Sequence, residues 1–355
     1  MTEPCVVCVP ARDEAERLPR LLRSLAAQTG FGSGAPLPVV VVANNCRDGT
    51  SEAAREAASR LPAIDLRLIE IDLPPDEAHV GTGRRMALDS GADWLAAQGA
   101  PDGVLLTTDA DARLPPDWVA ANLAALCGAE IVGGRLLIDP DVPLDPALAD
   151  LHARIERYWA HVRRLEDVLD PPAHDPAPRH GDHTGASLAL RAGLYREVGG
   201  LPALPRGEDN ALVARVREAG GRLRHCPGVG VAVSDRTLGR ADGGMAREMT
   251  RRAAIVRGEA AYRLPTPEHW LELIAGRARL GRIWREQPEE AEAALRALGL
   301  DRTVAAQITA GCPNAIAFVE RASRHLGASA PPAPETDLDA ALRGFEAWSG
   351  PAAGR

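Results

Sequence analysis

The sequence LLTTDADARLPPDW (residues 105–118) contains an apolar run that ends in two acids, Asp109 and Asp111. A short apolar run followed by a turn-forming segment is typical of a buried β-strand. Carboxylates this close in the chain repel one another, so we expect a positive or proton-sharing group beside them. A helical pattern begins at Pro115, where proline is tolerated in the first turn. The two acids therefore stand between a strand and a helix.

Strands and helices alternate through the first 140 residues. Apolar strand patterns lie at residues 5–11, 37–44, 65–72, 103–111 and 130–139, and helical patterns lie at 14–28, 50–61, 83–98 and 115–128. This alternation predicts an α/β fold whose mostly parallel sheet carries helices on both faces. Ligands bind such sheets at the carboxyl ends of the strands. Three polar segments, 11–14, 44–48 and 109–111, are therefore predicted to converge on one crevice.

The pattern changes after residue 140. We predict a long helix at 147–169, an irregular loop at 169–183, a strand at 186–192, a helix at 208–221 and one or two strands at 221–234. Beyond residue 245 the chain is predicted to be helical. A length of 355 residues suits one large domain with an appendage. We predict a domain at 1–240, with halves at 1–140 and 141–240, and a helical C-terminal extension at 241–355.

The bulk composition excludes some classes of protein. A net charge of −8 argues against a general nucleic-acid binder. The six cysteines are scattered, and Cys5 and Cys8 would point to opposite faces of one strand as buried thiols, which favours a reducing compartment. No apolar run approaches the roughly 20 residues of a membrane span, and no signal peptide is recognisable. We expect a cytoplasmic protein without a transmembrane segment.

Two acidic pairs carry the candidate chemistry. Asp109 and Asp111 are suited to binding Mg²⁺ or Mn²⁺ through oxygen ligands, although Asp111 is also suited to capping the helix that follows. Glu208 and Asp209 open a later helix, where acids are favoured by the helix dipole even without a catalytic role. Taken singly, both pairs leave the structural and the functional interpretation open.

Five elements in order make the sequence resemble the family 2 glycosyltransferases of the GT-A fold. They are Pro10–Ala11–Arg12–Asp13–Glu14 after the first strand, Asp48–Gly49–Thr50 after the second, Asp109–Ala110–Asp111 after the fourth, Gly199–Gly200–Leu201, and Glu208–Asp209 at a helix start. The resemblance covers about residues 4–235. It implies a nucleotide-binding half at 1–140, an acceptor half at 141–240, and a metal-dependent enzyme that moves a sugar from a UDP- or GDP-linked donor to a hydroxyl acceptor, with inversion favoured.

The resemblance also implies roles for single residues. Pro10, Ala11, Arg12, Glu14 and Asp48 would belong to the nucleotide pocket, and Asp109 would approach the ribose. Asp111, with Asp109 beside it, would hold Mn²⁺ or Mg²⁺ against the diphosphate. Asp209 would be the general base for the acceptor hydroxyl, with Glu208 next to it. Residues 170–185 are interpreted as part of the acceptor site, because the strand that follows leads towards this acidic pair.

The sequence departs from the family pattern at two places. Asn44 stands where many relatives have an aspartate that contacts the base, so the nucleobase preference is open. Asp235 stands near the position of a metal-binding histidine and is the candidate substitute for it. Arg84 and Arg85 follow Gly81 and Gly83 at a helix start that favours anions, and one arginine is expected to contact diphosphate while the other faces solvent.

Two alternatives remain open at this point. A sugar-phosphate nucleotidyltransferase would need a glycine-rich loop after the first strand, and VPARDEAERL (residues 9–18) contains no glycine. A non-catalytic nucleotide-sugar-binding protein of the same fold would not need both Asp111 and Asp209.

Overall fold

The computed structural model describes residues 3–30, 34–139, 145–233, 245–328 and 330–348. The chain divides into two compact units. The first unit comprises Met1–Val142, Pro178–Val216 and Arg222–Met249, and the second comprises Pro143–Ala177, Arg217–Gly221 and Thr250–Arg355. Each unit is described by itself.

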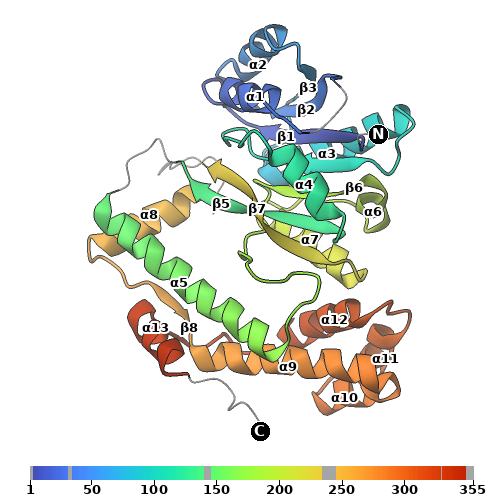
Figure 1. The fold of residues 1–355 in the computed structure, drawn as a ribbon, viewed down its shortest axis with the longest axis vertical. Helices are drawn as coiled ribbons and strands as arrows, with labels where there is room; N and C mark the ends of the chain where they lie inside the picture. Colours follow the sequence, from blue (N-terminus) through green and yellow to red (C-terminus); the bar gives the residue numbers. More distant parts are fainter. Residues whose placement is uncertain (1–2, 31–33, 140–144, 234–244, 329, 349–355) are drawn as a thin grey trace. The chain divides into compact units, whose positions relative to one another are not determined.

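A seven-stranded sheet forms the centre of the first unit (Figure 1). Its strands are β1 (Cys5–Ala11), β2 (Leu37–Asn44), β3 (Ile64–Ile71), β4 (Val104–Thr107), β5 (Ile131–Ile138), β6 (Leu188–Arg191) and β7 (Leu223–Val233). Their order is β3-β2-β1-β4-β6-β5-β7, and β6 alone runs antiparallel to both of its neighbours, β4 and β5. The predicted α/β class and mostly parallel sheet are confirmed.

Helices cover both faces of this sheet. One apolar cluster joins the sheet to α1 (Leu18–Ala26), α2 (Thr50–Ser59) and α4 (Trp118–Leu126), and the other joins it to α3 (Val80–Ala97), α6 (Ala192–Glu197) and α7 (Glu208–Glu218). Alternate side chains of β1 enter alternate clusters, so Cys5 lies on one face and Cys8 on the other. Both thiols are buried, as predicted.

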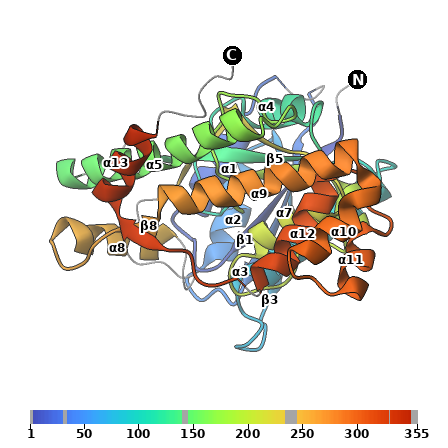
Figure 2. The same cartoon turned by 90° about the horizontal axis from the view of Figure 1, so that it is seen from below.

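The second unit is helical (Figure 2). It has two apolar cores of its own. Its helices are α5 (Pro146–Leu169), α9 (Pro267–Glu286), α10 (Ala291–Ala297), α11 (Arg302–Thr309), α12 (Ala315–Ala328) and α13 (Leu338–Ala347), with a 3₁₀ turn η1 at Pro288–Glu290. A short antiparallel pair, β8 (Arg263–Pro265) and β9 (Glu335–Asp337), was not predicted. Helix α8 (Met245–Val256) crosses the boundary between the units along the chain.

The domain division differs from the predicted one at α5. This helix was placed in the acceptor half at 141–240, yet the structure groups Pro143–Ala177 with the C-terminal helices. The reason is the apolar face of α5, where Tyr158 makes edge contacts with Trp159 and Phe345 and accepts a hydrogen bond from Trp270 Nε1 at 2.6 Å. The predicted boundary at 240/241 lies outside the described residues. Among the described helices, none is long and apolar enough to cross a bilayer.

Candidate active site

The loops that follow β1 and β2 are tied together at the carboxyl edge of the sheet. Glu14 N–H donates to Thr50 Oγ1 at 2.8 Å, and Ala15 N–H donates to Asp48 Oδ2 at 3.0 Å. Asp48 Oδ1 also accepts the Thr50 N–H at 3.0 Å. Helix α2 begins after Gly49, whose φ of 83° favours glycine. Asp48 shapes this edge by joining two loops.

The start of α3 packs against the same edge. Arg12 Nη1 donates to the Ala78 carbonyl at 2.7 Å, and Asn44 Nδ2 donates to the His79 carbonyl at 3.3 Å. A Cβ on Gly83 would lie 3.4 Å from the Cβ of Pro10, so the first turn of α3 rests closely on the end of β1. Pro10 and Asn44 are therefore brought together with the loop after β3, as the parallel sheet predicts.

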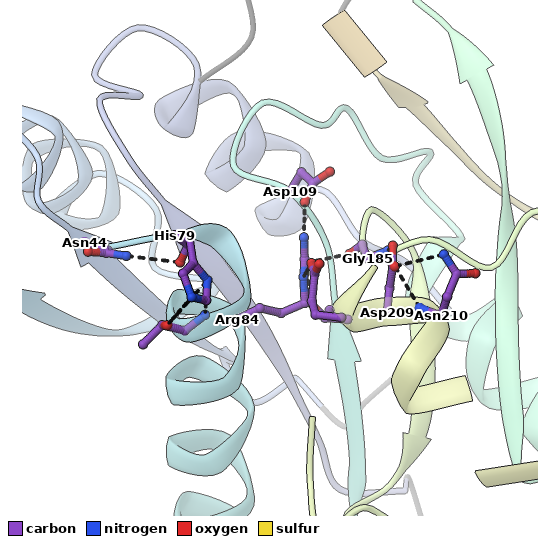
Figure 3. Close-up of polar contacts among 10 residues, drawn as sticks. Asn44, His79, Arg84, Asp109, Gly185, Asp209 and Asn210 are labelled. Atoms are coloured by element: carbon purple, nitrogen blue, oxygen red, sulfur yellow. Dashed lines mark hydrogen bonds and ion pairs between the residues drawn. The ribbon is translucent and has the colours of Figure 1, made fainter. Parts of the chain in front are cut away.

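The positive group expected beside the two acids is Arg84. Its Nη2 donates to Asp109 Oδ1 at 2.6 Å (Figure 3). The Arg84 side chain is only 3% exposed, whereas that of Asp109 is 35% exposed. Burial acts to lower the pKa of the guanidinium, but Asp109, Glu208 and Asp209 together hold that pKa above its usual value. Arg84 is therefore charged and forms ion pairs with the carboxylates of Asp109 and Glu208.

The second arginine faces the other way. Arg85 is exposed and forms an i,i+4 ion pair with Asp89 at 3.5 Å. We expected one of the two arginines to contact diphosphate and the other to face solvent, and the diphosphate contact stays a prediction. Arg84 is enclosed by protein groups, and Arg85 is the solvent-facing one.

Glu208 and Asp209 begin α7 directly after Gly207, whose φ is 69°. Glu208 is 5% exposed and accepts from Arg84 Nε at 3.2 Å. Burial raises the pKa of Glu208; the Arg84 charge opposes that effect and the Asp209 charge adds to it. Asp209 accepts the Gly185 N–H through Oδ2 at 2.8 Å and the Asn210 N–H through Oδ1 at 2.7 Å, so its carboxylate plane is fixed (Figure 3).

The oxygen chemistry of the β4 end suits a divalent cation. Asp111 is half-buried in the turn that follows β4, and it does not cap α4, because Asp117 precedes that helix. Within the described ranges, Asp109 Oδ2 accepts no hydrogen bond, which leaves one carboxylate oxygen available next to Asp111. Mg²⁺ is commonly held by one or two carboxylates together with substrate phosphates. The described residues contain no preformed group of three or more metal ligands, and Asp235 lies outside them.

Sequence reasoning did not single out Gly185 or Thr107. Gly185 donates its N–H to Asp209 and accepts from Arg84 Nη1 through its carbonyl at 2.7 Å, and Thr107 Oγ1 accepts from the same nitrogen at 3.0 Å. A Thr-Gly step after an irregular loop carries no distinctive pattern. The one signal in the sequence was a glycine at position 185, just before a predicted buried strand, which can indicate that another group packs closely against the backbone.

Three buried polar atoms without hydrogen-bond partners in the described part of the chain also lie at or next to the candidate site residues. Among the described residues, Asn44 Oδ1, Thr108 Oγ1 and Thr184 Oγ1 are buried without a hydrogen-bond partner. Thr108 adjoins Asp109, and Thr184 adjoins Gly185. Buried polar groups are rarely left unsatisfied, and exceptions concentrate at functional sites.

A mostly parallel sheet with acids at its carboxyl edge places the chain in the GT-A class of α/β folds. Within that class, residues 3–254 match the family described as "Glycosyltransferase like family 2". The chain therefore belongs to this family and is a glycosyltransferase. No curated protein matches the sequence.

Several solved structures are similar in fold. TarS 1-349 from S. aureus in complex with UDP-GlcNAc is 15% identical with a TM-score of 0.49, and 92% of this chain and 90% of that chain are covered. The mannosyltransferase PcManGT from Pyrobaculum calidifontis, in complex with GDP-Man and Mn²⁺, is 19% identical with a TM-score of 0.47, covering 92% and 87%. Glucosyl-3-phosphoglycerate synthase from M. tuberculosis is 14% identical with a TM-score of 0.41, covering 74% and 85%.

Proposed function

We propose that this glycosyltransferase moves a sugar from a nucleotide diphosphate donor to a hydroxyl acceptor with the help of Mn²⁺ or Mg²⁺. The observation that supports this most is the meeting of Asp109 and Asp209 around Arg84 at the carboxyl edge of the sheet (Figure 3). The first carboxylate belongs to the strand end expected to hold the donor. The second belongs to the helix start expected to activate the acceptor.

The donor side of the proposal uses the loops after β1, β2 and β4. Pro10, Ala11, Arg12, Glu14 and Asn44 form the nucleoside pocket, and Asp48 shapes it by joining the loops. Asp109 approaches the ribose, and Asp111 together with Asp109 would hold the cation. When bound, such a cation stabilises the negative charge of a departing diphosphate.

The acceptor side of the proposal rests on Asp209. Asp209 Oδ2 accepts the Gly185 N–H and retains a second lone pair for a proton, whereas Oδ1 accepts from both the backbone N–H and the side-chain amide of Asn210. Asp209 accepts the proton of the acceptor hydroxyl as that oxygen attacks the anomeric carbon, and the bond to the diphosphate oxygen breaks on the opposite side. A single displacement of this kind inverts the anomeric configuration. Residues 178–185, the part of the interpreted acceptor segment that lies in the first unit, supply acceptor contacts, and His183 lies two residues before Gly185.

A donor-hydrolysis assay tests the proposal. The protein is incubated with Mn²⁺ and, in turn, UDP-glucose, UDP-GlcNAc and GDP-mannose, and the released UDP or GDP is measured. Asp209→Asn is the matched control, because an amide oxygen still accepts the Gly185 N–H but is no base. We expect release by the wild type with one donor and a loss of about 10²–10⁴-fold in the variant. No release with any donor, or full activity of Asp209→Asn, contradicts the proposal.

A further inference from the structure

Arg84, on α3, makes four side-chain hydrogen bonds to three other segments of the first unit. Its donors reach Asp109 and Thr107 at the end of β4, the Gly185 carbonyl before β6, and Glu208 at the start of α7, at 2.6, 3.0, 2.7 and 3.2 Å. A guanidinium has five N–H donors in a rigid fork, so one side chain suffices for all four contacts. An ammonium has one nitrogen and does not span four acceptors in four directions.

Gly185 carries this connection onward to Asp209. Its carbonyl accepts from Arg84 Nη1, and its N–H donates to Asp209 Oδ2 at 2.8 Å. A Cβ at this position would lie 2.3 Å from Cζ of Arg84, so the flat guanidinium lies directly against the glycine backbone. The position of the Asp209 carboxylate is therefore linked through one backbone residue to the guanidinium, and through it to Asp109.

The charges around Arg84 show why an arginine is needed here. Asp109, Glu208 and Asp209 all raise its pKa, so one cation faces three carboxylates. Glu208 is buried and lies beside Asp209 in the chain, and without the guanidinium the two carboxylates repel each other in a poorly solvated place. The guanidinium thus permits a donor-side and an acceptor-side carboxylate to remain charged within one site.

We infer that Arg84 is a positioning residue, which holds the Asp209 carboxylate in register with the Asp109 strand end through the Gly185 backbone. This inference rests on the proposed function, in which Asp209 is the general base. Arg84 does not touch the donor, because its side chain is only 3% exposed and four of its five N–H groups donate to protein acceptors. Its contribution is therefore to turnover and not to nucleotide affinity.

The main variant is Arg84→Lys, which retains the positive charge and removes the fork. We expect kcat for donor hydrolysis to fall about 100-fold, since misplacement of a catalytic group by about 1 Å costs that much. The Kd for UDP or GDP with Mn²⁺, whichever binds the wild type, stays within about threefold of the wild-type value, because no donor contact is lost. Arg60→Lys is the matched control, since Arg60 is 74% exposed and, among the described residues, its side chain pairs with Glu56 of α2 alone.

A second measurement does not depend on turnover. Hydrogen exchange of the Gly185 amide is compared in the wild type and Arg84→Lys, and we expect it to be at least about tenfold faster in the variant. Arg60→Lys leaves this amide unchanged. If Arg84→Lys melts below the assay temperature, Glu208→Gln replaces it, because this change removes the charge of one Arg84 partner and retains an oxygen acceptor. A kcat loss with unchanged Kd in that variant supports the inference, and unchanged kcat contradicts it.

The outcomes separate the inference from the proposed function. A variant with wild-type kcat and wild-type exchange at Gly185 overturns the positioning role. A tenfold weaker Kd with unchanged kcat overturns it as well, and makes Arg84 a donor ligand. If the wild type hydrolyses no donor, the proposed function fails, and the exchange rate at Gly185 still decides whether Arg84 holds this backbone.

Discussion

Replacing Gly185 by alanine places a new Cβ against the guanidinium of Arg84. The new Cβ lies 2.3 Å from Arg84 Cζ and 2.5 Å from Nη2. Carbon atoms in contact prefer about 3.5–4.0 Å, so the guanidinium must retreat by about 1.2 Å. The bond from Nη1 to the Gly185 carbonyl, now 2.7 Å, then lengthens to about 3.9 Å, beyond the range of a hydrogen bond.

The magnitude follows from the bonds that are lost. Hydrogen bonds to charged groups contribute about 1.5–3 kcal/mol each, and losing one or two of them predicts a free energy of unfolding lower by about 2–5 kcal/mol. Donor hydrolysis is expected to fall about 100-fold, because the Gly185 N–H no longer fixes Asp209. Calorimetry measures the first effect, and UDP or GDP release with Mn²⁺ measures the second.

Gly128→Ala is the matched control for this change. Gly128 also lies in the first unit, but a Cβ there meets no atom within 4 Å. We expect its stability to stay the same or to rise by up to about 1 kcal/mol, since alanine restricts the unfolded chain. If Gly185→Ala behaves like Gly128→Ala in both assays, the close packing of Arg84 on Gly185 is refuted.

Three further predictions concern stability. Burial lowers the pKa of His180 from 6.5 to about 4, with Asp182 opposing the shift and His225 and Arg135 adding to it. Between pH 6.5 and 4 the unfolded chain therefore binds a proton at His180 that the folded chain does not bind, and the free energy of unfolding drops by up to about 3 kcal/mol as pH falls across this range. Urea titrations of His180→Gln are expected to lack this pH dependence. An equal pH dependence in wild type and variant contradicts the assignment to His180. Asp48→Ala removes the tie between two loops and lowers the free energy of unfolding by about 1–2 kcal/mol by urea titration, and an unchanged midpoint contradicts that role. Gly276→Ala in α9 meets no atom within 4 Å and raises the melting temperature through about 0.5–1 kcal/mol of helix propensity, whereas a lower melting temperature shows that the helix needs glycine there.

The sequence predicted the sheet well because its strands are periodic and apolar on both faces. β1 and β2 were predicted at the residues where the structure has them, and the segments after β1, β2 and β4 lie at one edge, as the parallel arrangement requires. The sequence also predicted that a positive or proton-sharing group lies beside Asp109 and Asp111. The sequence did not identify this group as Arg84, because two adjacent arginines at a helix start give no information on which side chain turns inward.

The misses have physical causes of two kinds. Helix α5 was placed in the acceptor half by its position in the chain, whereas its aromatic face decides its packing with α9 and α13. Gly185 was missed because its role depends on three segments that are distant in the sequence.

The most direct test of the account is the binding of UDP and GDP by isothermal titration calorimetry, with and without Mn²⁺, in the wild type and in Asp111→Asn. The account predicts that one nucleotide binds the wild type only when Mn²⁺ is present, and that Asp111→Asn loses this binding while its melting temperature is retained. Nucleotide binding that is equally tight without Mn²⁺ or in the variant, or no binding of either nucleotide by the wild type, would contradict it.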